Sequence, residues 1–332
     1  MTLKRFAVLF TAAMSAAALT TGVASAAGNA GISSTVARSA DGRPADTAAG
    51  QQATREFWTP EKMMASVPAD LPGDVAPTRR KAAPTGPAGR IDPVAPAVRP
   101  AVPSEVGVLA QYPSRSVGKV FFRLPGDGTL WHCSATTVGS ASRRLVLTAG
   151  HCLHSGGPGG GWATEFLFVP YYDRGSRPHG TFAATYLTAK DPWIQDRNFY
   201  YDMGIAVVAT NESGRRVVDE VGGNGAFWNE PREVHVVAQG YPLNIDGGER
   251  AKLCEGDTER VSLVDWRPAF PCGFGHGASG GPWFQEYEED PDGWGFGYVN
   301  GLTSTDADGG RIATPYFDDD FKSLYDFAES HA

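Results

Sequence analysis

The sequence predicts an all-β protein that ends in an α-helix, and three observations carry this prediction. From residue 117 onward, short runs rich in β-branched, aromatic and aliphatic residues are separated by Gly, Pro, Asp and Asn. No longer helical patterns alternate with these runs, which favours an antiparallel barrel or sandwich over β–α units. The 228 residues from 105 to 332 are enough for two barrels of about 100 residues each.

The predicted strands form two groups along the chain. The first group is Val117–Leu124, Leu130–Val138, Leu145–Ala149, Glu165–Val169, Thr181–Leu187 and Ile205–Ala209. The second group is Glu233–Ala238, Val261–Asp265, Gly281–Phe284 and Phe296–Thr303. Apolar residues then recur at helical spacing, at Phe317, Phe321, Leu324, Tyr325 and Ala328. Because the acidic run Asp318–Asp320 suits the positive end of a helix dipole, we expect a terminal helix to start there.

Residues 1–26 have the pattern of a secretory signal peptide. Lys4 and Arg5 precede a short apolar stretch, and Ala24-Ser25-Ala26 supplies the small residues of a cleavage site. The apolar stretch is too short and too interrupted for a membrane anchor. We therefore expect a secreted, extracellular protein.

Residues 27–104 are rich in Ala, Pro, Gly and Thr, with nine prolines from Pro68 to Pro103. Proline fixes φ and lacks a backbone donor, so we expect a pro-segment or linker that is extended and poorly packed. One apolar island, Phe57–Met64, has Thr59 as a helix cap and Pro60 at the first helical position. Two interpretations stay open: a pro-segment that docks on the following domain before removal, or an isolated helical turn in a disordered tail.

The charge distribution excludes some partners. The formal net charge is −8, and residues 105–332 hold 18 Lys and Arg against 30 Asp and Glu. Such an acidic domain is not expected to bind nucleic acid or anionic membranes non-specifically.

Four cysteines, Cys133, Cys152, Cys254 and Cys272, predict two disulfides in an exported protein, with three possible connectivities. The alternative is a metal site made from Cys133, Cys152 and neighbouring histidines. Those histidines are His132, His151 and His154. Their spacing fits no standard zinc pattern, so we expect no metal.

Two motifs far apart in the chain indicate nucleophilic catalysis. Thr148-Ala149-Gly150-His151-Cys152 ends an apolar run, and 128 residues after the histidine Ser279 lies within Gly277–Pro282. A serine hydroxyl needs a neighbouring base to become nucleophilic, so this pair points to covalent acyl transfer.

An acid that orients the imidazole would complete the constellation, and Asp202 is the candidate. It stands at the head of the apolar run Met203–Ala209, where a buried carboxylate needs partners. Asp191 and Asp196 are competitors, but they lie in a polar segment that looks solvated.

These residues resemble the chymotrypsin-like serine endopeptidases, in their secreted bacterial branch, and are similar to the glutamyl endopeptidase group. The resemblance covers roughly residues 105–332 and implies two antiparallel six-stranded β-barrels followed by a helix packed on the second barrel. The first barrel, 105–215, would carry His151 and Asp202, and the second, 216–332, would carry Ser279 and the specificity pocket. The resemblance also implies the disulfides Cys133–Cys152 and Cys254–Cys272.

The resemblance further implies that Ser279 attacks a peptide carbonyl while His151 serves as base and then as acid, with Asp202 orienting the ring. The backbone N–H groups of Gly277 and Ser279 would form the oxyanion hole. Substrates would be proteins or peptides, and no cofactor is needed. We expect a monomer, with its own pro-segment as a possible partner.

The chain departs from the family in two places. Ala278 replaces the aspartate that vertebrate digestive members pair with a freed amino terminus. The specificity pocket would lie around Gly273, Phe274, His276 and the strand Thr303-Ser304-Thr305. Gly273 supplies no carboxylate for Lys or Arg, and Thr303 stands where glutamyl endopeptidases have a histidine. Residue preference at the cleaved bond is therefore open.

Two other functions are alternatives. Gly277–Gly281 also fits the Gly-x-Ser-x-Gly elbow of α/β-hydrolase esterases, but that fold places its histidine after the serine, where only His331 follows. A catalytically silent binding protein on the same scaffold is the second alternative, although all three triad positions are occupied.

Overall fold

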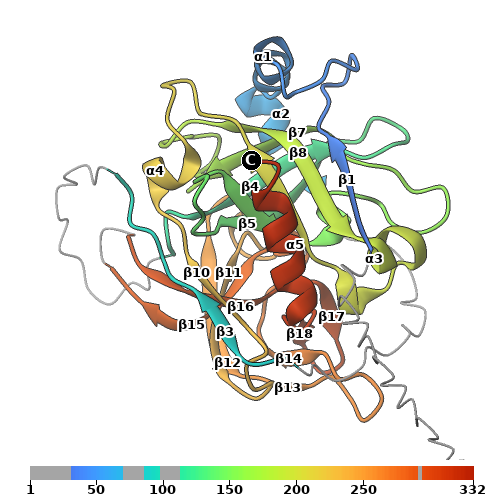
Figure 1. The fold of residues 1–332 in the computed structure, drawn as a ribbon, viewed down its shortest axis with the longest axis vertical. Helices are drawn as coiled ribbons and strands as arrows, with labels where there is room; N and C mark the ends of the chain where they lie inside the picture. The colour runs from blue at the N-terminus through green and yellow to red at the C-terminus, as the bar shows by residue number, and fades with distance from the viewer. Residues whose placement is uncertain (1–30, 70–85, 98–112, 291–293) are drawn as a thin grey trace, which may run out of the picture.

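The computed structural model describes residues 31–69, 86–97, 113–290 and 294–332. Its strands fall into two regions, with the carboxy-terminal helix lying across both (Figure 1). The predicted signal peptide 1–26 lies outside the described residues. Among the described residues, no helix is long and apolar enough to cross a membrane.

The first region is a closed antiparallel barrel of six strands. Around the ring, each strand hydrogen-bonds to the next in the order β4-β5-β6-β9-β8-β7, and β7 pairs with β4 to close it. The strands are β4 (Val117–Arg123), β5 (Trp131–Thr137), β6 (Leu145–Thr148), β7 (Thr164–Pro170), β8 (Phe182–Lys190) and β9 (Gly204–Val208). All six predicted strands of the first group are confirmed, each with ends within three residues of those predicted.

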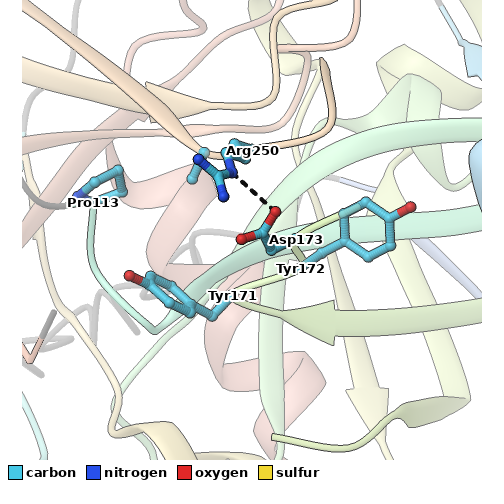
Figure 2. A pocket seen from close by; sticks show the side chains of 6 residues that line it. Pro113, Tyr171, Tyr172, Asp173 and Arg250 are labelled. Atoms are coloured by element: carbon cyan, nitrogen blue, oxygen red, sulfur yellow. Dashed lines mark hydrogen bonds and ion pairs between the residues drawn. The ribbon is translucent and has the colours of Figure 1, made fainter. Parts of the chain in front are cut away.

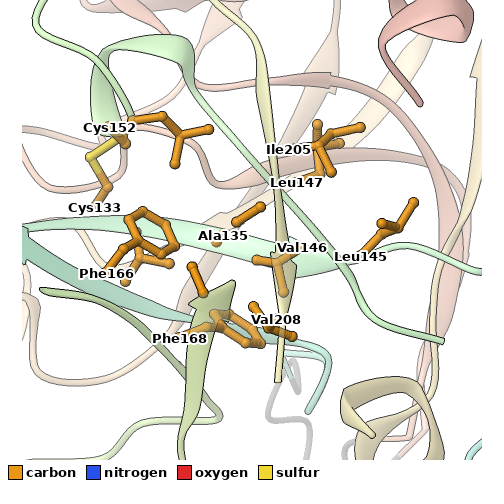
Figure 3. Close-up of a cluster of buried hydrophobic side chains, with 14 of the residues drawn as sticks. Cys133, Ala135, Leu145, Val146, Leu147, Cys152, Phe166, Phe168, Ile205 and Val208 are labelled. Atoms are coloured by element: carbon orange, nitrogen blue, oxygen red, sulfur yellow. A yellow bond between two sulfur atoms is a disulfide. The ribbon is translucent and has the colours of Figure 1, made fainter. Parts of the chain in front are cut away.

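Aliphatic and aromatic side chains from all sides of the barrel fill its interior. Ala135, Leu147, Phe168 and Ile205 are inaccessible to solvent and meet in one cluster (Figure 3). Burying each large apolar side chain contributes about 1.5–3 kcal/mol, so this core supplies much of the stability of the region.

The second region contains a six-stranded and a four-stranded sheet. The orders are β12-β11-β15-β16-β10-β3 and β13-β14-β18-β17. The strands are β3 (Gly89–Ile91), β10 (Gly225–Trp228), β11 (His235–Gly240), β12 (Lys252–Asp257), β13 (Glu259–Arg260), β14 (Pro268–Pro271), β15 (Pro282–Glu288), β16 (Phe296–Leu302), β17 (Thr305–Ala307) and β18 (Arg311–Ala313). Pairing is antiparallel except between β10 and β16. The all-β prediction is confirmed, and the α/β-hydrolase alternative is wrong because no central parallel sheet exists among the described residues.

One predicted strand is wrong. Residues 261–265 form an exposed turn in which the Ser262 N–H donates to the Asp265 carbonyl oxygen at 2.9 Å. Leu263 and Val264, which gave the run its β character, are 77% and 80% exposed. Local β propensity is overridden here because the polar residues of the turn bond to one another instead of to a neighbouring strand.

The terminal helix is α5 (Asp319–Glu329), capped by the Asp318 side chain, which accepts the Asp320 N–H. Its start confirms the prediction from the acidic run. Its packing corrects the expectation of a helix on the second barrel, because α5 lies mainly on β8 and β9 of the first barrel and contacts β10 less. The Tyr325 hydroxyl donates to the Gly139 carbonyl oxygen at 2.8 Å, which anchors the helix to the first barrel.

The amino-terminal segment corrects the expectation of a poorly packed connector. It forms β1 (Ile32–Val36), α1 (Ala48–Phe57), α2 (Pro60–Met64) and β2 (Val67–Pro68), which lie on the first barrel. β1 adds to β8 over five residue pairs, and β2 pairs in parallel with β5. We refer to Ile32–Ala69 below as the amino-terminal segment.

The apolar island within this segment is a buried anchor. Trp58 is 1% exposed and donates from Nε1 to the Glu165 carbonyl oxygen at 2.6 Å. Met63 is fully buried, and Thr59 caps α2 as predicted. Of the two open interpretations, the docked segment agrees with the structure and the isolated turn is wrong. Removal of the segment and the predicted boundaries at 27, 105 and 216 stay predictions.

The remaining helices are short and lie between strands. They are the 3₁₀ turns η1 (Gly150–Cys152), η2 (Phe199–Tyr201) and η3 (Asp246–Gly248), and the helices α3 (Asp191–Asp196) and α4 (Val217–Val221). Of these, η1 and η2 position the candidate site.

Candidate active site

His151 lies in a tight turn directly after strand β6. That strand delivers the chain through Thr148 and Ala149 into η1, and the Cys152–Cys133 disulfide fixes the turn to β5. The imidazole is 2% exposed, and the Trp193 ring lies edge-on to it at 6.1 Å between centroids. Trp193, which the sequence did not single out, helps to wall the ring from solvent.

Asp202 holds His151 at two points. It follows η2 and precedes β9, and its carboxylate is completely buried. Oδ1 accepts the backbone N–H of His151 at 2.8 Å, and Oδ2 lies 2.8 Å from His151 Nδ1. The Ser304 hydroxyl also donates to Oδ2, at 2.6 Å. Because a carboxylate only accepts, Nδ1 carries a proton, and Nε2 is the ring nitrogen that can act as a base.

The two competing aspartates lie elsewhere. Asp191 opens α3 and accepts the Ser33 hydroxyl at 2.6 Å. Asp196 is exposed at the end of the same helix. The carboxylate bonded to His151 is therefore that of Asp202.

Ser279 lies in a tight turn whose backbone conformation, before and after the serine, favours glycine. Gly277 and Gly280 have φ of +91° and +80°, in the region that side chains disfavour. A Cβ on Gly280 would lie 2.1 Å from Thr148 Oγ1 and 2.9 Å from the Ala149 nitrogen. This turn, Gly277–Gly281, is called the serine turn below. It contacts the backbone that leads into His151, so the two predicted motifs meet.

Ser134 joins β5 to this serine turn. Its N–H donates to the Ser279 carbonyl oxygen at 2.7 Å, and its hydroxyl donates to the Gly277 carbonyl oxygen at 2.9 Å. The same hydroxyl accepts the Tyr241 N–H at 2.9 Å. These bonds turn both carbonyl groups toward β5. Sequence reasoning missed Ser134, because its partners are more than 100 residues away.

The predicted pocket residues occupy two neighbouring stretches of chain. The Asn244 side chain holds 273–276 by donating to the Gly273 carbonyl oxygen and accepting the Gly275 N–H, both at 2.8 Å. Phe274 is 6% exposed and packs in the core of the second region, whereas the position of a Cβ on Gly273 meets no atom within 4 Å. The backbone of His276 accepts the Leu243 N–H.

On the strand 303–305, the side-chain hydroxyl groups all form hydrogen bonds within the protein. Thr303 Oγ1 accepts the Trp283 indole N–H, and Thr305 Oγ1 accepts an N–H of Arg267, both at 3.0 Å. The buried Arg267 is paired with Asp265 at 2.7 Å. The Ser304 hydroxyl donates to Asp202, and its contact with substrate stays a prediction.

Both disulfides form as predicted, Cys133–Cys152 and Cys254–Cys272. Cys133, His151 and Cys152 lie close enough for a shared metal, but the two sulfur atoms are bonded to each other and cannot act as thiolate ligands. His154, another member of the alternative metal set, accepts the Gly156 N–H through Nδ1 at 2.9 Å.

A separate pocket lies at the end of β7. It has a volume of about 280 Å³ and is lined by residues that include Tyr171, Tyr172, Asp173 and Arg250 (Figure 2). Arg250 and Asp173 form an ion pair at 2.9 Å across it. None of the predicted site residues lines this pocket.

Solved structures that share the fold include two proteases. One is the protease Anisep from Arthrobacter nicotinovorans and the other is AL20, a thermostable serine protease from an extremophilic microorganism. Each is 32% identical, covers 66% of this chain and 99% of its own, and has a TM-score of 0.59. A Glu endopeptidase is 15% identical with a TM-score of 0.51, covers 66% of this chain and 92% of its own, and shows the fold alone. No protein-family model and no curated protein matches the chain.

Proposed function

Since the chain belongs to the chymotrypsin-like family of serine proteases, we propose that it is a secreted endopeptidase with Ser279, His151 and Asp202 as its catalytic triad. The main observation behind this proposal is that Asp202 forms two hydrogen bonds with His151, one to the ring and one to the backbone, of 2.8 Å each. A buried carboxylate in this position stabilises the imidazolium that forms when the ring takes a proton.

In the proposed reaction, Ser279 Oγ attacks the scissile carbonyl carbon while His151 Nε2 accepts the hydroxyl proton. The C–N bond then breaks, and the imidazolium gives this proton to the leaving amine, which leaves an acyl-enzyme. Water, deprotonated by the same nitrogen, attacks the ester, and the serine leaves with its proton restored.

We assign the oxyanion hole to the N–H groups of Gly277 and Ser279. Ser134 supports this assignment because it binds the carbonyl groups of both residues. Among the described residues the Gly277 N–H donates to no acceptor, so it is available to a developing oxyanion. Such donors stabilise the tetrahedral intermediate more than the substrate, which raises kcat.

Substrates are peptides or proteins. For residue preference, Gly273 leaves open space and Thr303 is engaged by Trp283, so neither supplies a charged anchor. Cleavage of a peptide library by the mature protein measures the preference directly. A sharp preference for Glu would assign the recognition to His276, whereas bulky apolar residues would indicate an uncharged slot.

Export from the cell and a monomeric state are parts of the same proposal. Two disulfides support an oxidising compartment, where thiols do not stay reduced. Amino-terminal sequencing of protein from the culture medium tests export and shows where the chain is cut.

The deciding experiment is Ser279→Ala. We expect kcat to fall on the order of 10⁶-fold while circular dichroism and both disulfides stay unchanged. A fluorophosphonate probe should label the wild type stoichiometrically at Ser279 and should also label the control Ser330→Ala. Undiminished activity of Ser279→Ala would remove the nucleophile assignment, and an inert wild type would support the silent binding protein.

A further inference from the structure

His132 is a buried histidine that the triad does not use. It lies on β5 next to Cys133 and is 1% exposed. Its Nε2 faces the serine turn, since a Cβ on Gly277 would lie only 3.2 Å from it. The ring therefore packs against the glycine whose N–H we assign to the oxyanion hole.

Ser66 of the amino-terminal segment determines which ring nitrogen carries the proton. The Ser66 hydroxyl donates to the Met63 carbonyl oxygen at 2.6 Å and lies 2.9 Å from His132 Nδ1. A hydroxyl has one proton, and the carbonyl oxygen takes it. Ser66 Oγ must then accept from His132, so Nδ1 is protonated and Nε2 has a bare lone pair.

The His132 ring stays neutral. Burial, reinforced by the nearby charge of Lys119, holds the pKa of His132 well below its usual value of 6.5. Among the described residues, Nε2 has no hydrogen-bond partner. The part of the ring that faces Gly277 is therefore an uncharged nitrogen that carries no hydrogen atom. This allows the ring to approach Gly277 closely.

The backbone fixes the position of Ser66. After α2, the Val67 N–H donates to the Leu130 carbonyl oxygen at 2.9 Å and the Ala69 N–H donates to the His132 carbonyl oxygen at 3.0 Å. These bonds hold the amino-terminal segment beside β5, one of them two residues before His132 and the other at His132 itself. Ser66 and His132 are therefore held together although they are 66 residues apart.

We propose that Ser66 is a positioning residue for the oxyanion hole: its hydrogen bond orients the His132 ring, and the ring supports the backbone of Gly277. This inference rests on the proposed function. If Ser66 has this role, the amino-terminal segment stays bound during turnover and contributes to the activity of the enzyme.

Loss of the Ser66 hydroxyl removes the acceptor for Nδ1–H. The Nδ1–H is then left without its partner, so the proton can move to Nε2 or the ring can rotate. The first change places an N–H, and the second a C–H, against Gly277 where Nε2 offered only a lone pair. A displacement of catalytic groups by about 1 Å costs up to about 10²-fold in rate. We expect Ser66→Ala to lower kcat about tenfold with KM changed less than twofold.

The matched control is Ser34→Ala. Ser34 lies on the same segment and hydrogen-bonds Tyr186 at 3.0 Å, on the side of the barrel where β1 adds to β8. We expect wild-type kcat and KM for Ser34→Ala, and slower phosphonylation of Ser279 only in Ser66→Ala. Wild-type kcat in a folded Ser66→Ala protein, or equal losses in both variants, would overturn the proposal.

Nitrogen-15 NMR of the histidine rings shows which ring nitrogen of His132 carries the proton. A purely structural role of Ser66 would leave this tautomer unchanged in Ser66→Ala. In the wild type His132 should show a protonated Nδ1 and an unprotonated Nε2, assigned by the signal missing from His132→Gln. If Ser66→Ala does not fold, the tenfold fall in kcat is expected in His132→Gln instead, and wild-type kcat there would refute the proposal. Full activity of Ser279→Ala would overturn the proposed function, whereas an inactive Ser279→Ala beside a fully active Ser66→Ala overturns only this inference.

Discussion

The backbone N–H of Ser134 donates to the carbonyl oxygen of Ser279 at 2.7 Å, so the first barrel directly holds the turn of the proposed nucleophile. The Ser134 hydroxyl adds bonds to Gly277 and Tyr241. One serine on β5 thereby connects the first barrel to the serine turn and to the end of β11.

Replacing Ser134 by Ala tests this connection. The backbone bond to Ser279 stays, but the Gly277 carbonyl oxygen and the Tyr241 N–H lose a buried partner. We expect the free energy of unfolding to fall by about 1–3 kcal/mol and kcat to fall about tenfold, measured by urea unfolding and peptide hydrolysis.

Thr136→Val is the control for Ser134→Ala. Thr136 lies on the same strand and its hydroxyl is also buried, but it bonds to Ser116 and Asn224. A comparable loss of stability with wild-type kcat is expected. If both variants lose kcat equally, Ser134 has no specific role in the serine turn.

Asp202→Asn should leave a folded protein with very low activity. The amide nitrogen would face His151 Nδ1 and favour the tautomer with the proton on Nε2, which cannot act as a base. We expect kcat to fall about 10⁴-fold near neutral pH. Asp196→Asn, an exposed carboxylate on α3, should keep wild-type kcat, and the reverse result would transfer the assignment to Asp196.

Trp58→Ala tests whether the amino-terminal segment stabilises the enzyme. Trp58 is buried against the first barrel and hydrogen-bonds to Glu165, so we expect a loss of about 3–5 kcal/mol in the free energy of unfolding. Met64, six residues later, is 51% exposed, and Met64→Ala should change the free energy of unfolding by less than about 0.5 kcal/mol. Equal, small effects in thermal and urea unfolding would mean that the segment is dispensable.

The titration of Glu165 is expected to make the folded protein less stable as the pH rises. Burial raises its pKa above the ordinary value of 4.5, although its bond from the Ala40 N–H opposes the shift. The folded protein therefore holds this proton more tightly than the unfolded chain. The contribution to stability is complete below pH 4.5 and is lost as the pH rises through the raised pKa.

Glu165→Gln removes this titration. We expect the stability of the variant relative to the wild type to increase as the pH rises from 4 to 7, measured by urea unfolding at several pH values. A difference that is constant over this range would contradict the raised pKa.

Strand positions in the first barrel could be predicted because their signals are local. Buried runs such as Leu145–Thr148 are mostly aliphatic, and Gly, Pro, Asp and Asn residues are frequent between the runs. The same holds for α5, whose acidic cap and helical spacing are adjacent in the chain. The run at 261–265 misled because propensity alone does not supply a neighbouring strand.

The amino-terminal segment could not be predicted in the same way. Thr47 and Thr59 cap its two helices, which is a local signal, but the prolines that follow it favoured an extended linker. The segment is ordered by residues 186–190 of β8, which lie beyond the short pairing of β8 with β7, and by the apolar surface that receives Trp58. Neither is visible from the segment itself.

By itself the sequence determined the β-rich class, the terminal helix, the two glycine-flanked motifs and the candidate acid, because each depends on residues close together in the chain. Only the tertiary structure decided that Asp202 holds His151, that Ser134 binds the serine turn and that Ser66 reaches His132. These contacts join residues 51 to 143 positions apart, and burial makes their hydrogen bonds obligatory once the first barrel and the second region have formed.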